Sequence, residues 1–208
     1  MKRKTIFILL GVAIVLVATS LVGFYLITKP DDSEWLPNEI IELDSIEKYG
    51  YVLEDRDSFL YKNTFENLSD VLMQEEIDYE EYAKLLSQLY IIDLYTINNK
   101  INQYDVGSTD FIKDEHKENF ELNVKDTLYK YVEDNTYGKR VQELPEVSSI
   151  TVKDMIKQNV RLADQEYEGY VVLLSWEYLK DLGYDNSAKV SLAKIDEKLY
   201  IINQSASS

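Results

Sequence analysis

An uncharged apolar segment of 23 residues, from Thr5 to Ile27, restricts the chain more than any other feature of its sequence. As a helix it would extend about 35 Å, enough to cross the hydrocarbon core of a bilayer with modest tilt. A cleavable signal peptide is the alternative, but the apolar centre of a signal peptide ends after about 7–15 residues. The sequence therefore predicts a retained transmembrane helix over residues 5–27, in contact with membrane lipid.

The charges that flank this segment predict which way it crosses the membrane. Three basic residues at positions 2–4 precede it, whereas Lys29 is followed closely by Asp31 and Asp32. Basic residues beside a membrane segment favour the cytoplasmic side, so residues 1–4 are expected in the cytoplasm. The expected localisation is the cell membrane, as a single-pass protein with an extracytoplasmic C-terminal domain.

The part of the chain beyond the apolar segment is strongly acidic. Residues 30–208 contain 18 basic and 38 acidic side chains, a difference of −20. Such a surface repels nucleic acid, so no nucleic-acid partner is expected. The acidity favours solubility, or a docking face for a basic protein partner at the outer surface of the membrane.

The residues that most often carry catalysis or bind metals are scarce. Cysteine is absent, which excludes disulfides and cysteine-based zinc sites or nucleophiles. The only histidine, His116, lies in the polar stretch 114–118 and is expected to be exposed. No segment has the oxygen and glycine spacing of an EF-hand loop. We therefore expect no metal and no cofactor, and a non-enzymatic role is favoured over an enzymatic one.

Composition divides the outer part into a stalk, one domain and a tail. Two prolines, Pro30 and Pro37, enclose acidic and small residues, which disfavours regular structure and predicts a stalk over residues 28–37. Residues 38–204 are long enough for one domain with its own core. The small polar residues 205–208 are expected to form a disordered tail.

The first half of the domain has the periodicity of helices. Apolar side chains recur three or four residues apart over 57–72, 78–101 and 114–133. Asp57 and Asp78 are expected to cap the first two helices. The second helix is expected to be central, because large apolar residues surround it near its middle.

The period changes to two beyond Pro145. Strands are predicted at about 149–163, 169–179, 187–194 and 198–203, and an additional edge strand at 49–53. The first strand is expected to bend or bulge around 154–158. The predicted fold class is α+β: an N-terminal transmembrane helix followed by about three helices packed on a bent antiparallel sheet of about four strands, which would leave a cone.

This order of elements resembles the nuclear transport factor 2-like, or cystatin-like, superfamily. The N-terminal membrane helix followed by an external domain is similar in layout to the channel-assembly factors of type IV secretion and conjugation systems. The resemblance implies an accessory role in a secretion, conjugation or cell-envelope complex. It transfers no functional residue to this sequence.

Asp93 is the one acid within a strongly apolar helical stretch, and helical spacing places it on an apolar side. A buried carboxylate needs partners. Backbone amides, a tyrosine hydroxyl and the arginines Arg56, Arg140 and Arg161 are the candidates. In the structural interpretation Asp93 fixes the helix against the sheet; in the functional one it lines the mouth of the cone.

Tyrosine is the other unusual feature, with 17 residues. Tyr167, Tyr170, Tyr178 and Tyr184 lie near the predicted hairpins and are interface candidates, with packing at the sheet edge as the alternative. The leading functional prediction is a membrane-anchored extracytoplasmic interaction or assembly module. An enzyme or small-ligand-binding domain that uses Asp93, and an acidic surface domain without a specific ligand, are alternatives. A homo-oligomer is also left open.

Overall fold

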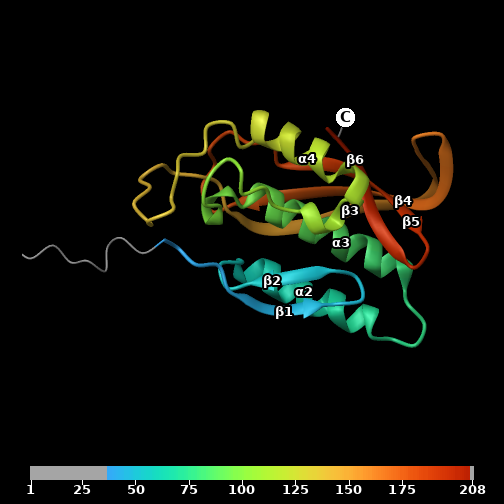
Figure 1. Ribbon diagram of the computed structural model, residues 1–208. Coiled ribbons are helices and arrows are strands. Elements are labelled where there is room, and N and C mark those ends of the chain that lie inside the picture. The colour runs from blue at the N-terminus through green and yellow to red at the C-terminus, as the bar shows by residue number, and fades with distance from the viewer. Residues whose placement is uncertain (1–36, 207–208) are drawn as a thin grey trace, which may run out of the picture. The chain divides into compact units, whose positions relative to one another are not determined.

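Residues 37–206 are described by a computed structural model, in which they form one compact unit (Figure 1). The predicted transmembrane segment and almost all of the stalk lie outside the described residues. Within 37–206, no helix combines the length and the apolarity needed to cross a membrane.

A four-stranded antiparallel sheet forms the C-terminal half of the domain. Its strands are β3 (Val147–Leu162), β4 (Gln165–Tyr178), β5 (Ser187–Ile195) and β6 (Lys198–Ala206), in the spatial order β3-β4-β5-β6. The predicted meander and the interior position of the strand at 169–179 are confirmed. β6 pairs with β5 up to Ala206, which lies opposite Ala188. The prediction of a disordered tail from Ser205 was therefore wrong for its first two residues.

The pattern of alternating apolar residues explains why this sheet has one buried face. Along β4, the side chains of Tyr170, Val172, Leu174 and Trp176 are each at most 3% exposed. Val172 lies opposite Val190 of β5, which is fully buried too. Alternate residues of a strand point to the same face, so these side chains form one side of the core. The register between β3 and β4 shifts between Val152 and Asp154, just before the predicted irregularity at 154–158.

Three α-helices precede the sheet: α2 (Phe59–Leu72), α3 (Tyr79–Tyr95) and α4 (Asp114–Asp126). The structure is thus α+β, with the helices packed on the antiparallel sheet. α3 is buried on almost all sides and contacts β3, β4 and β6, while α2 packs on α3. Figure 1 shows α2 and α4 on different sides of α3. The prediction of a central second helix is confirmed.

The ends of the helices correct three sequence predictions. Ser58, rather than Asp57, caps α2, because its side chain accepts a hydrogen bond from the Tyr61 amide at 3.2 Å. Asp78 caps α3 as expected. α3 ends at Tyr95 and is followed by the 3₁₀ helix η2 (Ile97–Asn99), and α4 ends before 133. Tyr131, which belongs to the apolar pattern over 114–133, is 77% exposed.

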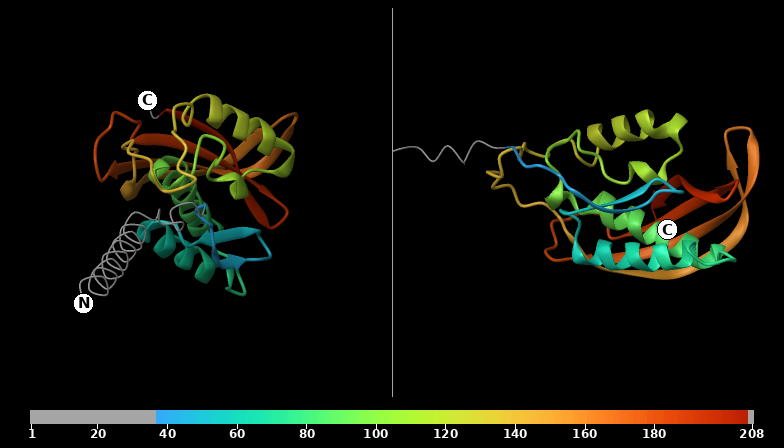
Figure 2. Two further views of the ribbon diagram at one scale, coloured as in Figure 1. Left: turned by 60° about the vertical axis from the view of Figure 1, so that its left-hand side comes forward. Right: turned by 60° about the horizontal axis from the view of Figure 1, so that its bottom comes forward.

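The strand predicted at 49–53 belongs to a separate two-stranded ribbon. β1 (Glu42–Ile46) pairs with β2 (Tyr51–Glu54), and neither joins the larger sheet. The ribbon is attached to α3 by a buried hydrogen bond of 2.6 Å between the hydroxyls of Tyr51 and Tyr82. Figure 2 shows the ribbon (blue) from two further sides. This attachment positions one wall of the site described next.

Candidate functional site

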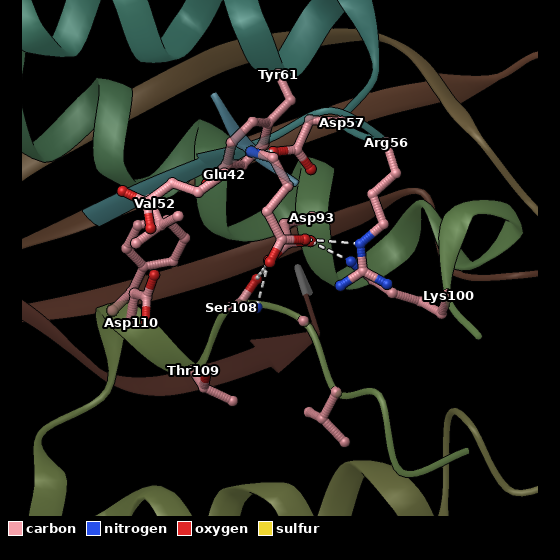
Figure 3. Close-up of a pocket in the computed structure, with 14 residues that line it drawn as sticks. Glu42, Val52, Arg56, Asp57, Tyr61, Asp93, Lys100, Ser108, Thr109 and Asp110 are labelled. Carbon is pink, nitrogen blue, oxygen red and sulfur yellow. Dashed lines mark hydrogen bonds and ion pairs between the residues drawn. The ribbon is translucent and has the colours of Figure 1, made fainter. Parts of the chain in front are cut away.

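A pocket of about 350 Å³ lies where the β1–β2 ribbon, α2, the C-terminal end of α3 and the loop 105–111 meet (Figure 3). Five acidic and two basic residues line it, so its lining carries an excess of three negative charges. We call it the acidic pocket. It is lined by Glu42, Val52, Glu54, Arg56, Asp57, Tyr61, Asp93, Lys100, Val106, Gly107, Ser108, Thr109, Asp110 and Phe111.

Asp93 and Lys100 form an ion pair on one side of the acidic pocket. The Lys100 side chain is only 2% exposed and that of Asp93 15%. The Ser108 amide also donates to the Asp93 carboxylate, and the Ser108 hydroxyl donates to the Tyr90 carbonyl at 2.8 Å. Asp93 therefore holds the loop 105–111 against α3, as the dashed lines in Figure 3 indicate.

Two backbone features allow the loop to come so close. A Cβ atom on Gly107 would lie 2.8 Å from the Asp93 carbonyl oxygen and 2.9 Å from its Oδ1. Ser108 adopts a left-handed conformation with φ of 67°, which costs a non-glycine residue free energy. The hydrogen bonds to Asp93 and Tyr90 offset that cost.

The second cation, Arg56, is also engaged by acids. Its guanidinium contacts Asp105 through both terminal nitrogens, and its Nε donates to Glu54 at 2.6 Å. Burial opposes the charged form of Arg56, but the hydrogen bonds and charges of Asp105 and Glu54 raise its pKa above the ordinary value. Neither cation of the acidic pocket is therefore free to neutralise the remaining acids.

Three carboxylates remain: Glu42, Asp57 and Asp110. None of them has an ion-pair partner within residues 37–206. Burial raises the pKa of Asp57 to about 6, although the Glu54 amide donates to its carboxylate at 2.7 Å. Burial likewise raises the pKa of Asp110. Asp57 and Asp110 are both half-buried, and the surroundings of each disfavour the negative charge of its carboxylate.

Tyr61 adds a hydroxyl that is accessible from the pocket. The residue is 5% exposed, and its ring stacks on Phe65 with the centroids 6.3 Å apart. Within the described part of the chain the hydroxyl has no hydrogen-bond partner. Burial, and then the charges of Asp93 and Asp57, raise its pKa well above the ordinary value, so the hydroxyl stays protonated. Figure 3 shows Tyr61 directed into the pocket.

The arginines predicted to pair with Asp93 contact other groups. Arg56 binds Asp105 and Glu54, Arg140 donates to the carbonyls of Lys100 and Asn98 at 2.8 and 2.6 Å, and Arg161 pairs with Glu166 at the surface. The prediction of an arginine partner was wrong, because Lys100 folds back onto the end of α3. The inner face of the sheet is covered by α3, so the pocket does not lie in the predicted cone.

The four tyrosines proposed for an interface lie in different environments. Tyr170 is 1% exposed within the core, so the structure contradicts an interface role for it. The rings of Tyr178 and Tyr184 pack together with centroids 6.5 Å apart, which is the packing alternative. Tyr167 lies on the part of the β3–β4 hairpin beyond Gly169, where β5 no longer pairs with β4.

Sequence reasoning missed Lys100, Tyr61 and Asp110, and it assigned Asp57 only as a helix cap. One signal was available: Ser58 is an equally good cap, which leaves the neighbouring Asp57 without that role. Asp110 follows a glycine-containing break in the helical pattern, where loops that form sites are common. Nothing in the local sequence indicates that these residues converge.

The charged groups of the acidic pocket do not form a metal cluster. Within residues 37–206, no three histidine, cysteine, aspartate or glutamate side chains are placed to share one ion. The arrangement offers hydrogen-bond acceptors on several walls and one hydroxyl. Comparisons with protein-family models, with curated proteins and with solved structures find no match to the chain, so the site is interpreted from its own chemistry.

Proposed function

We propose that the chain is a membrane-anchored extracytoplasmic interaction module, and that its outer domain accepts a cationic group of a partner in the acidic pocket. The observation that carries this proposal is the excess of carboxylates at the pocket. Both cations of the lining are already paired, whereas Glu42, Asp57 and Asp110 are not. Burial raises the pKa of Asp57 although Lys100 attracts its charge. Burial also raises the pKa of Asp110 although Lys117 and Lys198 attract that charge. An incoming cation therefore adds compensation that these lysines leave incomplete.

The membrane location of this module rests on the apolar segment 5–27 and its flanking charges. Glu42 follows the predicted stalk by five residues in the sequence, so we place the partner near the outer surface of the membrane. An accessory role in a secretion, conjugation or cell-envelope complex fits a protein partner of this kind. A basic surface would also be attracted by the acidity of the whole outer domain.

Site-specific photo-crosslinking in cells tests the proposal. A photoreactive amino acid at Thr109, which lines the pocket, is expected to give adducts with a cell-envelope protein. The double variant Asp57→Asn, Asp110→Asn should reduce these adducts severalfold. A matched control, Asp70→Asn with Glu75→Gln, removes two exposed acids outside the pocket and should leave them unchanged. Equal loss in both double variants would show that overall acidity, and not the pocket, attracts the partner.

A free small cationic ligand is the second candidate, and the pocket volume favours it. About 350 Å³ lies within the range of about 300–1,000 Å³ that is usual for small-molecule sites. This candidate no longer depends on Asp93, whose carboxylate is engaged by Lys100 and Ser108. It predicts binding of a small cation by the purified chain without any crosslinked protein.

A further inference from the structure

We infer that the cationic group is an organic ammonium or guanidinium group with N–H donors, and that Asp57, Asp110 and the Tyr61 hydroxyl bind it. The inference rests on the proposed function and narrows it to one class of ligand. It concerns a chemistry that is shared by free amines and by the lysine and arginine side chains of proteins.

The positions of the acids favour an extended organic cation over a metal ion. Asp57 lies in the turn between β2 and α2, Asp110 lies in the 3₁₀ helix η3 (Thr109–Phe111), and Glu42 lies on β1. Figure 3 shows Asp57 and Asp110 on different sides of the pocket. A calcium ion needs about six to eight oxygens at about 2.3–2.6 Å simultaneously. An organic cation reaches separate carboxylates with different N–H groups.

Tyr61 is the observation that makes this a built site and not only an acidic cluster. The residue is only 5% exposed and lines the pocket, and its hydroxyl, which is itself accessible from the pocket, has no hydrogen-bond partner in residues 37–206. A hydroxyl in this position is available to bond a group that enters the pocket. Because Tyr61 is protonated and surrounded by acids, its oxygen is suited to accept an N–H from the ligand while its own hydrogen turns to a carboxylate.

The same geometry excludes a quaternary ammonium ligand as a good fit. Quaternary ammonium groups are recognised mainly by the faces of several aromatic rings. Among residues 37–206, the lining of the acidic pocket contains two aromatic residues, Tyr61 and Phe111. Carboxylates gain most from charge-assisted hydrogen bonds, which need N–H donors.

Titration of the purified full-length chain in detergent micelles tests this inference. The probes are agmatine, which carries one guanidinium and one ammonium group, then tetramethylammonium, Ca²⁺ and a blocked Gly-Arg-Gly peptide. Agmatine or the peptide should bind, at least about tenfold more tightly than tetramethylammonium or Ca²⁺. Binding of agmatine identifies a free amine as a sufficient ligand; binding of the peptide alone identifies a protein side chain as the source.

Three variants show whether binding occurs at the acidic pocket. Asp57→Asn with Asp110→Asn should weaken binding of the probe at least about tenfold. Tyr61→Phe should weaken it severalfold, while its thermal unfolding midpoint stays near that of the wild type. Asp70→Asn with Glu75→Gln should leave affinity unchanged. If Ca²⁺ binds more tightly than the other probes, and the double variant Asp57→Asn, Asp110→Asn loses this binding, the inference fails and the proposed function survives. If no probe depends on these residues, both fail.

Discussion

Lys100 directs its ammonium group onto the Asp93 carboxylate, at the point where α3 ends and the chain turns back. The Lys100 side chain is almost completely enclosed, so its charge cannot be exposed without local unfolding. A pair of this kind contributes little when compared with an apolar pair of the same shape, but the loss of one partner leaves an uncompensated buried charge.

Asp93→Asn is expected to lower the free energy of unfolding by about 3–5 kcal/mol, because the enclosed Lys100 then lacks a counter-charge. Asp93→Ala should cost at least as much, since it also removes the acceptor of the Ser108 amide. Adding Lys100→Met to Asp93→Asn should recover part of the loss. Urea unfolding of the four proteins measures this. An Asp93→Asn variant as stable as the wild type, but unable to bind a partner, would support a functional role for Asp93 instead.

Gly107→Ala is expected to destabilise the chain by about 1–3 kcal/mol through overpacking, since the added Cβ would lie 2.8 Å from the Asp93 carbonyl. The Ser108 amide should also lose its protection from hydrogen exchange, because the loop must move away from α3. Gly183→Ala is the control: nothing lies within 4 Å of its Cβ position, and only its φ of 78° is unfavourable. A protected Ser108 amide in Gly107→Ala would contradict this account.

The order of helices and strands could be predicted because it depends on the spacing of apolar residues within each segment. α3 and β4 show this most clearly, since both contain too many large apolar residues to be anything but buried. The end of α3 could not be predicted in the same way. The helical pattern continues to Ile101, but the chain leaves the helix at Tyr95, and Lys100 then returns to Asp93.

The candidate site could be predicted only in its central acid. Asp93 is recognisable because it interrupts an apolar stretch, whereas its partner lies seven residues later and beyond the helix end. Asp57, Tyr61 and Asp110 meet only because the β1–β2 ribbon and the loop 105–111 both attach to α3. Such an arrangement depends on long-range packing, to which local periodicity is insensitive.

The raised pKa of Asp57 predicts how stability depends on pH. Its folded-state pKa of about 6 lies above its ordinary value of 3.8, so the folded chain binds this proton more tightly than the unfolded chain. The stabilisation is fully present below the ordinary value and is lost as the pH rises through about 6. Asp57→Asn cannot lose a proton, so it should gain stability relative to the wild type between about pH 4 and pH 7.

Thermal unfolding of the wild type and Asp57→Asn at a series of pH values measures that difference. The comparison cancels the contribution of Asp105, which both proteins share. Burial opposes the change, but Arg56 lowers the pKa of Asp105. The contribution of Asp105 to stability therefore changes with pH in the opposite direction to that of Asp57. Such a gain would identify Asp57 as a residue whose charge costs stability, as is common at binding sites. A difference that stays constant with pH would contradict the raised pKa.

The proposed orientation in the membrane can be tested with single cysteines, because the chain has none of its own. A cysteine at the exposed position Asn119 should react with a membrane-impermeant maleimide that reaches the outer face of the membrane. A cysteine inserted after Met1 should react only after the membrane is permeabilised, since residues 1–4 are expected in the cytoplasm. Both proteins should remain in the membrane fraction after an alkaline wash, and the cysteine-free chain gives the background. Release of a shortened chain from the membrane would instead identify residues 5–27 as part of a cleaved signal peptide, and the partner would then no longer have to be met at the membrane surface.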